Sequence, residues 1–170
     1  KQQPSGMHLV SMGVIDRARR LARRNVHILS EAVRQGYSIV TTEPSAALCL
    51  THEYPSLLGA DDTEAIAENT SDASTYLWRL HQRGKLELDF QPVNATVGYH
   101  LPCHLRALDV GSPGENLLRL IPGLTVRRLD KGCSGMAGLY GLQRANYRAS
   151  LRSGWELISA LRSPSLQAGT

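Results

Sequence analysis

The sequence predicts an α/β fold built from two pseudo-repeats, each with a short, mainly parallel sheet flanked by helices. Short β-branched segments alternate with segments of helical periodicity, which is typical of this class. Hydrophobic residues make up 42% of the 170 residues, enough for a mostly aliphatic core. The stretches PSGMHLVSMG (4–13) and KGCSGMAGLYG (131–141) resemble each other, which indicates an internal repeat.

In the first half, residues 15–36 are expected to form a helix, because apolar side chains recur on one side and Gly36 is a suitable end. A strand at 37–42 (YSIVTT) follows. A helix restarts in EPSAALCL (43–50), where a proline suits the first turn. Residues 61–84 are predicted as one long helix, acidic at its start.

In the second half, residues 85–95 are interpreted as a linker and 96–100 as a strand that leads into LPCH. A helix is expected at 113–123, with proline at its start and glycine past its end. Residues 124–129 (LTVRRL) predict another strand, and 141–162 a further helix.

The two halves can be aligned with the same order of elements. Gly13 then falls on Gly141, Arg24 on Arg152 and Leu29 on Leu157, while the strand at 37–42 falls on 165–170. We therefore expect a first repeat over 1–90, truncated at its N-terminal side, and a second over 91–170, truncated at its C-terminal side. A longer parent protein is expected to carry, after Thr170, a loop equivalent to the one after Thr42.

The charge pattern is led by arginine, with a net charge of +4 and a dense patch RARRLARR at 17–24. The simplest interpretation is a solvated helix face. The alternative is a docking face for an acidic partner, formed by Arg17, Arg20 and Arg24. No aromatic residue is interleaved and no nucleic-acid-binding motif is present, so no nucleic-acid partner is expected. No apolar run is long enough to span a membrane.

Three cysteines at wide spacing argue against a disulfide framework and for a reducing, cytoplasmic location. Cys103 and Cys133 each follow a predicted strand, where α/β sheets place ligands, so both thiols are expected to enter one pocket. Iron–sulfur clusters and zinc use such thiols, and His100 and His104 could add imidazole. Two alternatives remain open: buried, inert thiols, or a nucleophilic Cys103 beside His104.

A family resemblance covers nearly the whole chain. TTEPSAALCLTHEYP (41–55), YHLPCHLRAL (99–108), GENLLRLIPG (114–123) and LDKGCSGMAGLYGL (129–142) resemble the cysteine-rich CCG domain. This domain occurs in heterodisulfide reductase and in the iron–sulfur subunits of anaerobic glycerol-3-phosphate dehydrogenase and of glycolate and lactate oxidases. The chain looks most like the C-terminal region of fused FAD-linked oxidase iron–sulfur proteins.

The resemblance implies an electron-transfer module between a flavin site and an acceptor such as a quinone, with FAD on a separate domain or subunit. It implies Cys103 and Cys133 as ligands of a [4Fe–4S] cluster. Ser134 replaces the second cysteine of the CCG turn, followed by Gly135. Cys49 lies one helical turn from the position where relatives carry a thiol, and is a further candidate ligand.

In the first repeat the turn has become Pro4-Ser5-Gly6, without a thiol. The cluster is therefore expected in a full-length parent, completed by thiols beyond Thr170, and absent from this fragment. The fragment alone is not expected to be catalytic. A peripheral position at the inner membrane face is a further expectation.

Overall fold

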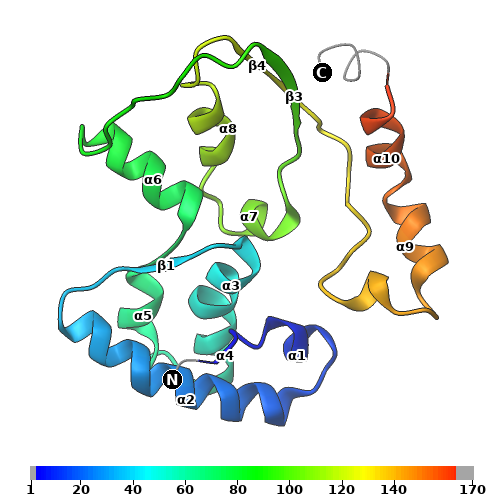
Figure 1. Cartoon of the computed structure of the whole chain (residues 1–170). Coiled ribbons are helices and arrows are strands. Elements are labelled where there is room, and N and C mark those ends of the chain that lie inside the picture. The colour runs from blue at the N-terminus through cyan, green and yellow to red at the C-terminus, as the bar shows by residue number, and fades with distance from the viewer. Residues whose placement is uncertain (1–2, 164–170) are drawn as a thin grey trace. The chain divides into compact units, whose positions relative to one another are not determined.

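The computed structural model describes residues 3–163, and the chain divides into two compact units, unit 1 (Lys1–Ala73) and unit 2 (Ser74–Thr170) (Figure 1). Each unit contains one parallel two-stranded sheet, β1–β2 in unit 1 and β3–β4 in unit 2, together with helices. This arrangement confirms the predicted α/β class. The assignment of the two pseudo-repeats to 1–90 and 91–170 stays a prediction.

Unit 1 begins with two helices and continues with alternating short strands and helices. Its elements are α1 (Met7–Ser11), α2 (Ile15–Arg34), β1 (Ile39–Thr41), α3 (Pro44–Leu48), the π-helix η1 (Cys49–Glu53), α4 (Tyr54–Leu58), α5 (Glu64–Glu68) and β2 (Thr70–Asp72). The helix and strand expected at 15–36 and 37–42 are thus confirmed as α2 and β1.

The long helix α2 is strongly amphipathic, as its sequence pattern predicts. It buries a narrow stripe formed by Ala18, Ala22, Asn25 and Leu29, and it packs against α1, α4 and α5. The small alanines let neighbouring helices approach closely, whereas the arginines on the other side remain in solvent.

The prediction of one helix over 61–84 is wrong. The structure has α5, then the strand β2, then α6 (Ala73–Gln82). The strand pairs with β1 in parallel, with Ile39 opposite Thr70 and Thr41 opposite Asp72. Residues Asn69 to Asp72 are weak helix formers, so pairing with β1 outweighs the helical pattern around them.

Unit 2 starts with the rest of α6. No helix or strand occurs in 83–94, so the linker expected at 85–95 is confirmed except for Ala95, which begins β3. The parallel strands β3 (Ala95–Tyr99) and β4 (Leu124–Arg128) follow the predicted segments, and the connection between them carries α7 (Cys103–Ala107) and α8 (Pro113–Leu118). The chain then forms the 3-10 turn η2 (Tyr140–Leu142), α9 (Tyr147–Ser153) and α10 (Trp155–Leu161).

The single helix predicted over 141–162 is therefore divided, and α9 and α10 meet at Gly154. A Cβ atom at this glycine would lie 2.6 Å from the carbonyl oxygen of Ser134, so the helix approaches the turn at 133–135 closely. The strand expected at 165–170 lies outside the described residues. Because both interruptions arise from contacts distant in sequence, local periodicity could not reveal them.

Candidate functional site

Cys103 and Cys133 are brought together at one edge of the unit 2 sheet. Strands β3 and β4 run parallel, with Tyr99 opposite Arg128, so the chain leaves both strands at the same edge. Cys103 begins α7, a few residues after β3. Cys133 lies in the turn that follows β4, near enough to Cys103 for its charge and hydrogen bonding to contribute to the raised pKa of the Cys103 thiol. The sheet topology thus gathers two thiols that are thirty residues apart in sequence.

The turn that carries Cys133 directs a backbone donor at its sulfur atom. The N–H group of Gly135 donates to Cys133 Sγ at 3.2 Å. Gly135 has φ of +80°, a left-handed conformation that favours glycine, and a Cβ atom there would collide with the carbonyl oxygen of Ser150. Hydrogen bonds to sulfur are one of the means by which proteins tune metal-bound thiolates.

Cys103 is exposed, as a free thiol. Partial desolvation raises its pKa above the ordinary value, and repulsion and hydrogen bonding from Cys133 raise this pKa further. The cation of Arg106 acts in the opposite direction but does not outweigh them. Because reactive cysteines have a lowered pKa, this environment does not favour a thiol enzyme.

Cys49 lies in unit 1, in a different setting from the paired thiols. It is fully buried, and its sulfur donates to the carbonyl oxygen of Ser5 at 3.4 Å. Burial raises its pKa to about 12. A thiol that is protonated and hydrogen-bonded in this way packs as a core side chain. Its role as a ligand stays a prediction.

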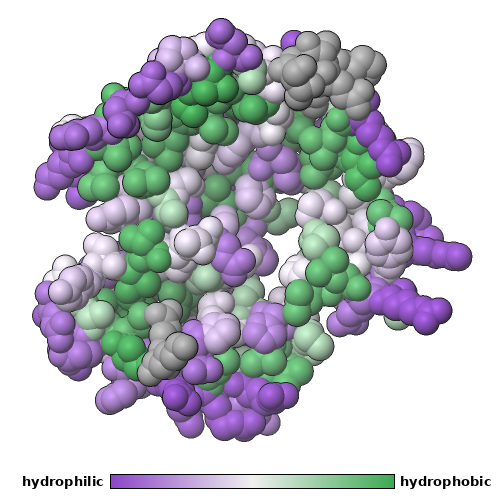
Figure 2. All heavy atoms as spheres, in the orientation of Figure 1, coloured by the Kyte–Doolittle hydropathy of each residue, from purple (hydrophilic) through white to green (hydrophobic). Residues whose placement is uncertain are grey.

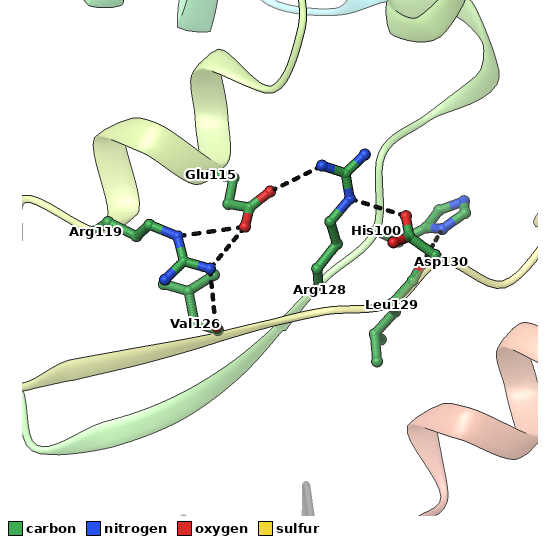
Figure 3. A network of polar contacts seen from close by, with 7 residues as sticks. All are labelled: His100, Glu115, Arg119, Val126, Arg128, Leu129 and Asp130. Atoms are coloured by element: carbon green, nitrogen blue, oxygen red, sulfur yellow. Dashed lines mark hydrogen bonds and ion pairs between the residues drawn. The ribbon is translucent and has the colours of Figure 1, made fainter.

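The two candidate histidines lie near the thiols in sequence. His100 Nδ1 lies 3.3 Å from the carbonyl oxygen of Leu129, so this ring is held against the chain just after β4 (Figure 3). His104 is half-buried in the first turn of α7. Within residues 3–163 no group of three or more His, Cys, Asp or Glu side chains is placed to hold a metal ion.

An iron–sulfur cluster uses about four protein ligands. Cys103 and Cys133 fit two of them, and the 170 residues contain one further thiol, Cys49. Ligation of a cluster by Cys103 and Cys133 stays a prediction.

Sequence reasoning missed a polar network beside the sheet (Figure 3). The carboxylate of Glu115 is buried in α8 and pairs with Arg119 at 2.8 Å and with Arg128 at 3.6 Å. Arg119 also donates to the carbonyl oxygen of Val126, and Arg128 pairs with Asp130. This network fixes α8 on β4. The spacing of Glu115 and Arg119, one helical turn apart, was the signal that could have found it.

The predicted partner-binding arginines are on the solvent side of α2. Arg17, Arg20 and Arg24 are all exposed, and their spacing places them on one side of the helix. Partner binding by these residues stays a prediction.

Comparison with known proteins shows homology to dehydrogenases and their subunits. The chain is 35% identical over 159 residues to one subunit of the anaerobic glycerol-3-phosphate dehydrogenase of Escherichia coli (strain K12), and equally to the same subunit from strain O157:H7. Each match covers 93% of this chain and 40% of the relative. These homologues confirm the resemblance inferred from the sequence motifs.

A second relative is the D-2-hydroxyglutarate dehydrogenase of Pantoea ananatis (strain AJ13355), 27% identical over 153 residues. This match covers 87% of the chain but 14% of the relative, so the chain spans less than half the length of each of these relatives. No protein-family profile matches the chain, and no solved structure matches it. Among the described residues, no helix is both long and apolar enough to cross a membrane.

Proposed function

We propose that this chain is part of an iron–sulfur electron-transfer subunit of a flavin-linked dehydrogenase that oxidises glycerol 3-phosphate or a 2-hydroxy acid. The names of two relatives, an anaerobic glycerol-3-phosphate dehydrogenase subunit and a D-2-hydroxyglutarate dehydrogenase, support this substrate class. The observation that carries the proposal is that Cys103 and Cys133 follow two neighbouring parallel strands at the same edge of the sheet, near enough for Cys133 to affect the pKa of Cys103.

Cys103 and Cys133 would supply two thiolate ligands of a [4Fe–4S] cluster, with the Gly135 N–H group donating to one of them. Such a cluster accepts and releases one electron at a time. Since the sequence contains one further thiol, the remaining ligands would come from protein outside these 170 residues. Ser134 replaces a thiol of the family turn, and its Oγ instead accepts a hydrogen bond from the N–H group of Met136 at 3.5 Å.

FAD would be bound by a separate domain or subunit, and a quinone is the proposed electron acceptor. A peripheral position at the inner membrane face would be consistent with quinone reduction. The order in which electrons pass among flavin, cluster and quinone depends on the assembled enzyme.

The test is an iron and sulfide assay on the protein purified without oxygen from its own cells, together with its absorption near 400 nm. Cys103→Ser and Cys133→Ser should each lower iron content and absorption severalfold. Cys49→Ser should leave both unchanged if Cys49 is a core residue, and a loss there would instead identify Cys49 as a ligand. A metal-free protein that still transfers electrons at the full rate would rule the proposal out.

A second candidate function is partner docking without a redox centre. It is favoured by the exposed row of Arg17, Arg20 and Arg24. Reversing these three charges to Glu should abolish complex formation with an acidic partner if docking is the function. Intact complexes in the charge-reversed protein would exclude it.

A further inference from the structure

We propose that Cys103 and Cys133 are also a dithiol–disulfide pair, which an anionic low-molecular-weight disulfide of the glutathione type oxidises to one intrachain disulfide. A thiol reductant restores the two thiols. The bond needs only the thiols that the unit 2 sheet brings together. The inference therefore goes beyond the proposed function and holds whether or not a cluster binds there.

The first argument is the way in which the chain leaves the two strands. Tyr99 lies opposite Arg128 in the last pair of the ladder between β3 and β4. Beyond this pair, the N–H group of Leu129 donates to the carbonyl oxygen of Tyr99 at 2.7 Å. His100 Nδ1 lies 3.3 Å from the carbonyl oxygen of Leu129. The two exit segments thus run side by side past the end of the sheet, and each reaches its cysteine within a few residues.

Both sulfur atoms are held near this end of the sheet. Cys103 is the first residue of α7. The N–H group of Gly135 donates to Cys133 Sγ at 3.2 Å, which limits the directions in which this sulfur can point. Desolvation raises the pKa of the Cys103 thiol, and charge and hydrogen bonding from Cys133 raise it further, as is expected of near neighbours. Because folding has already brought the pair together, little further chain entropy is lost when the bond closes.

The two thiols differ in exposure, which fixes the order of the steps. Cys103 is exposed, whereas Cys133 is half-buried. A soluble disulfide therefore meets Cys103 first, although the raised pKa of this thiol makes the step slow. In the mixed disulfide, Cys133 is already near the sulfur that it attacks, so the second step is intramolecular and favoured.

The reaction balances with the small disulfide as the oxidant. In the first step the Cys103 thiolate attacks one sulfur of the small disulfide, the S–S bond breaks, and one small thiolate leaves. In the second step the Cys133 thiolate attacks Cys103 Sγ, and a second small thiolate leaves. The leaving thiolates take up the two protons that the cysteines lose. The pair has lost two electrons, and the small disulfide has gained them.

The bond also removes an unfavourable interaction between the two sulfur atoms. A second thiolate beside a first one is disfavoured by repulsion, whereas a disulfide carries no charge. The thiolate is the form of cysteine that ligates a metal. The oxidised pair is therefore closed to metal until it is reduced.

Basic side chains next to the thiols indicate an anionic oxidant. Arg106 lies one helical turn after the first thiol and Lys131 two residues before the second, and both are exposed. Asp130, the acidic neighbour of Lys131, is paired with Arg128. Figure 2 shows strongly hydrophilic side chains projecting from α9 of the same unit, where arginines are exposed. A disulfide that carries carboxylates is attracted to such a surface.

Peptide mapping tests the bond in the protein as its own cells make it, after a chelator and a reductant have removed any metal and been removed themselves. Trypsin cleaves after Arg106 and Lys131, so the two cysteines fall on separate peptides, 86–106 and 132–144. With glutathione disulfide we expect these peptides to be joined, at their summed mass less two hydrogen atoms. Cys133→Ser should leave about tenfold more glutathione on Cys103, because no thiol displaces it.

The unfolded chain is the reference for the effect of the fold. In a fixed mixture of reduced and oxidised glutathione, the ratio of linked to reduced pair should be about tenfold higher in buffer than in urea. Cys49, buried in unit 1, should stay reduced in buffer and is the internal control. Equal ratios with and without urea, glutathione on both cysteines, or a bond from either cysteine to any other thiol would overturn the proposal.

Oxidants of opposite charge test the class of the oxidant. The rate of bond formation with glutathione disulfide is divided by the rate with cystamine, which is cationic. This quotient should fall severalfold when Arg106→Gln and Lys131→Gln are combined, because the attraction for the anion is lost. Combining Arg106→Lys with Lys131→Arg keeps both charges and should leave the quotient unchanged. An unchanged quotient in the Gln variant would overturn the assignment of an anionic oxidant.

Discussion

At the scale of single residues, the proximity of Cys133 makes the ionisation of Cys103 depend on its neighbour. A thiolate at one position raises the free energy of forming a thiolate at the other, because like charges repel at short range. A metal cation removes this penalty. Two adjacent thiols with a directed N–H donor are therefore better suited to ligation than to nucleophilic attack.

This coupling predicts the pH dependence of alkylation. At pH 7.5 Cys103 should react with iodoacetamide more slowly than a free thiol, and the rate should rise through an inflection above the ordinary thiol pKa. Cys133→Ala removes repulsion and a hydrogen bond that raise the pKa of Cys103. Its thiolate fraction should then increase, and the rate at pH 7.5 should rise severalfold.

Mass spectrometry of each cysteine-containing peptide gives the rates. Cys49 is the internal control, since its buried thiol should stay unmodified until the protein unfolds. An unchanged or slower reaction of Cys103 in the Cys133→Ala protein would contradict the coupling.

Gly135 allows a second test at this scale. Gly135→Ala should lower the free energy of unfolding by about 3 kcal/mol or more, because a left-handed backbone is unfavourable for alanine and the new Cβ atom collides with the Ser150 carbonyl group. Gly132→Ala is the matched control. It also has a positive φ, of +40°, but no atom lies within 4 Å of its Cβ position.

Urea unfolding of both variants separates the two causes. Gly132→Ala should lower the free energy of unfolding only by the cost of the left-handed backbone, on the order of 1 kcal/mol. Equal losses in the two variants would show that the packing of the turn on α9 contributes nothing.

At the scale of elements, a buried charge helps to hold α8 on β4. Glu115 is buried, whereas its partners Arg119 and Arg128 have side chains that are 54% and 42% exposed. Glu115→Gln should therefore lower the free energy of unfolding by about 2 kcal/mol. This is less than the loss expected when one partner of a fully buried ion pair is removed, because the released arginines regain water. Asp130→Asn, at the exposed end of the network, should change stability little.

Thermal and urea unfolding at low and high salt check this prediction. The effect of Glu115→Gln should decrease only in part at 1 M salt, since the buried carboxylate is screened less than an exposed charge, whereas its arginine partners are accessible to salt. A cost that disappears in salt would mean that Glu115 acts as a surface charge.

The elements that could be predicted from the sequence are those in which the residue pattern agrees with the way the element packs in the folded protein. Strands β1, β3 and β4 are rich in β-branched residues, and α2 has a clear apolar stripe. Strand β2, in contrast, is Thr-Ser-Asp, and it is a strand because β1 provides hydrogen-bonding partners. The break at Gly154 likewise depends on Ser134, twenty residues away.

In the candidate site too, some contacts could be predicted from the sequence and others could not. The meeting of Cys103 and Cys133 follows from a general property of parallel strands, so sequence order was sufficient to predict it. The hydrogen bond from Cys49 to Ser5 and the pairing of Glu115 with Arg128 join residues that no periodicity connects. Such contacts are determined by tertiary packing.

At the scale of the whole molecule, each unit has its own parallel strand pair and its own buried side chains, so each should open as a separate cooperative unit. Asn25 tests unit 1. It is buried, and its amide nitrogen donates to the carbonyl oxygen of Pro4 and to the Tyr54 hydroxyl. Asn25→Ala removes both hydrogen bonds, although the Tyr54 hydroxyl still donates to the carbonyl oxygen of Ser5, and it should speed amide hydrogen exchange throughout unit 1, while β3 and β4 keep their protection. Gly135→Ala should do the reverse, speeding exchange in unit 2 and leaving β1 and β2 protected. Hydrogen exchange followed by mass spectrometry resolves the two patterns. If either variant speeds exchange equally in both sheets, the chain opens as one cooperative unit, and the two units are not independent in stability.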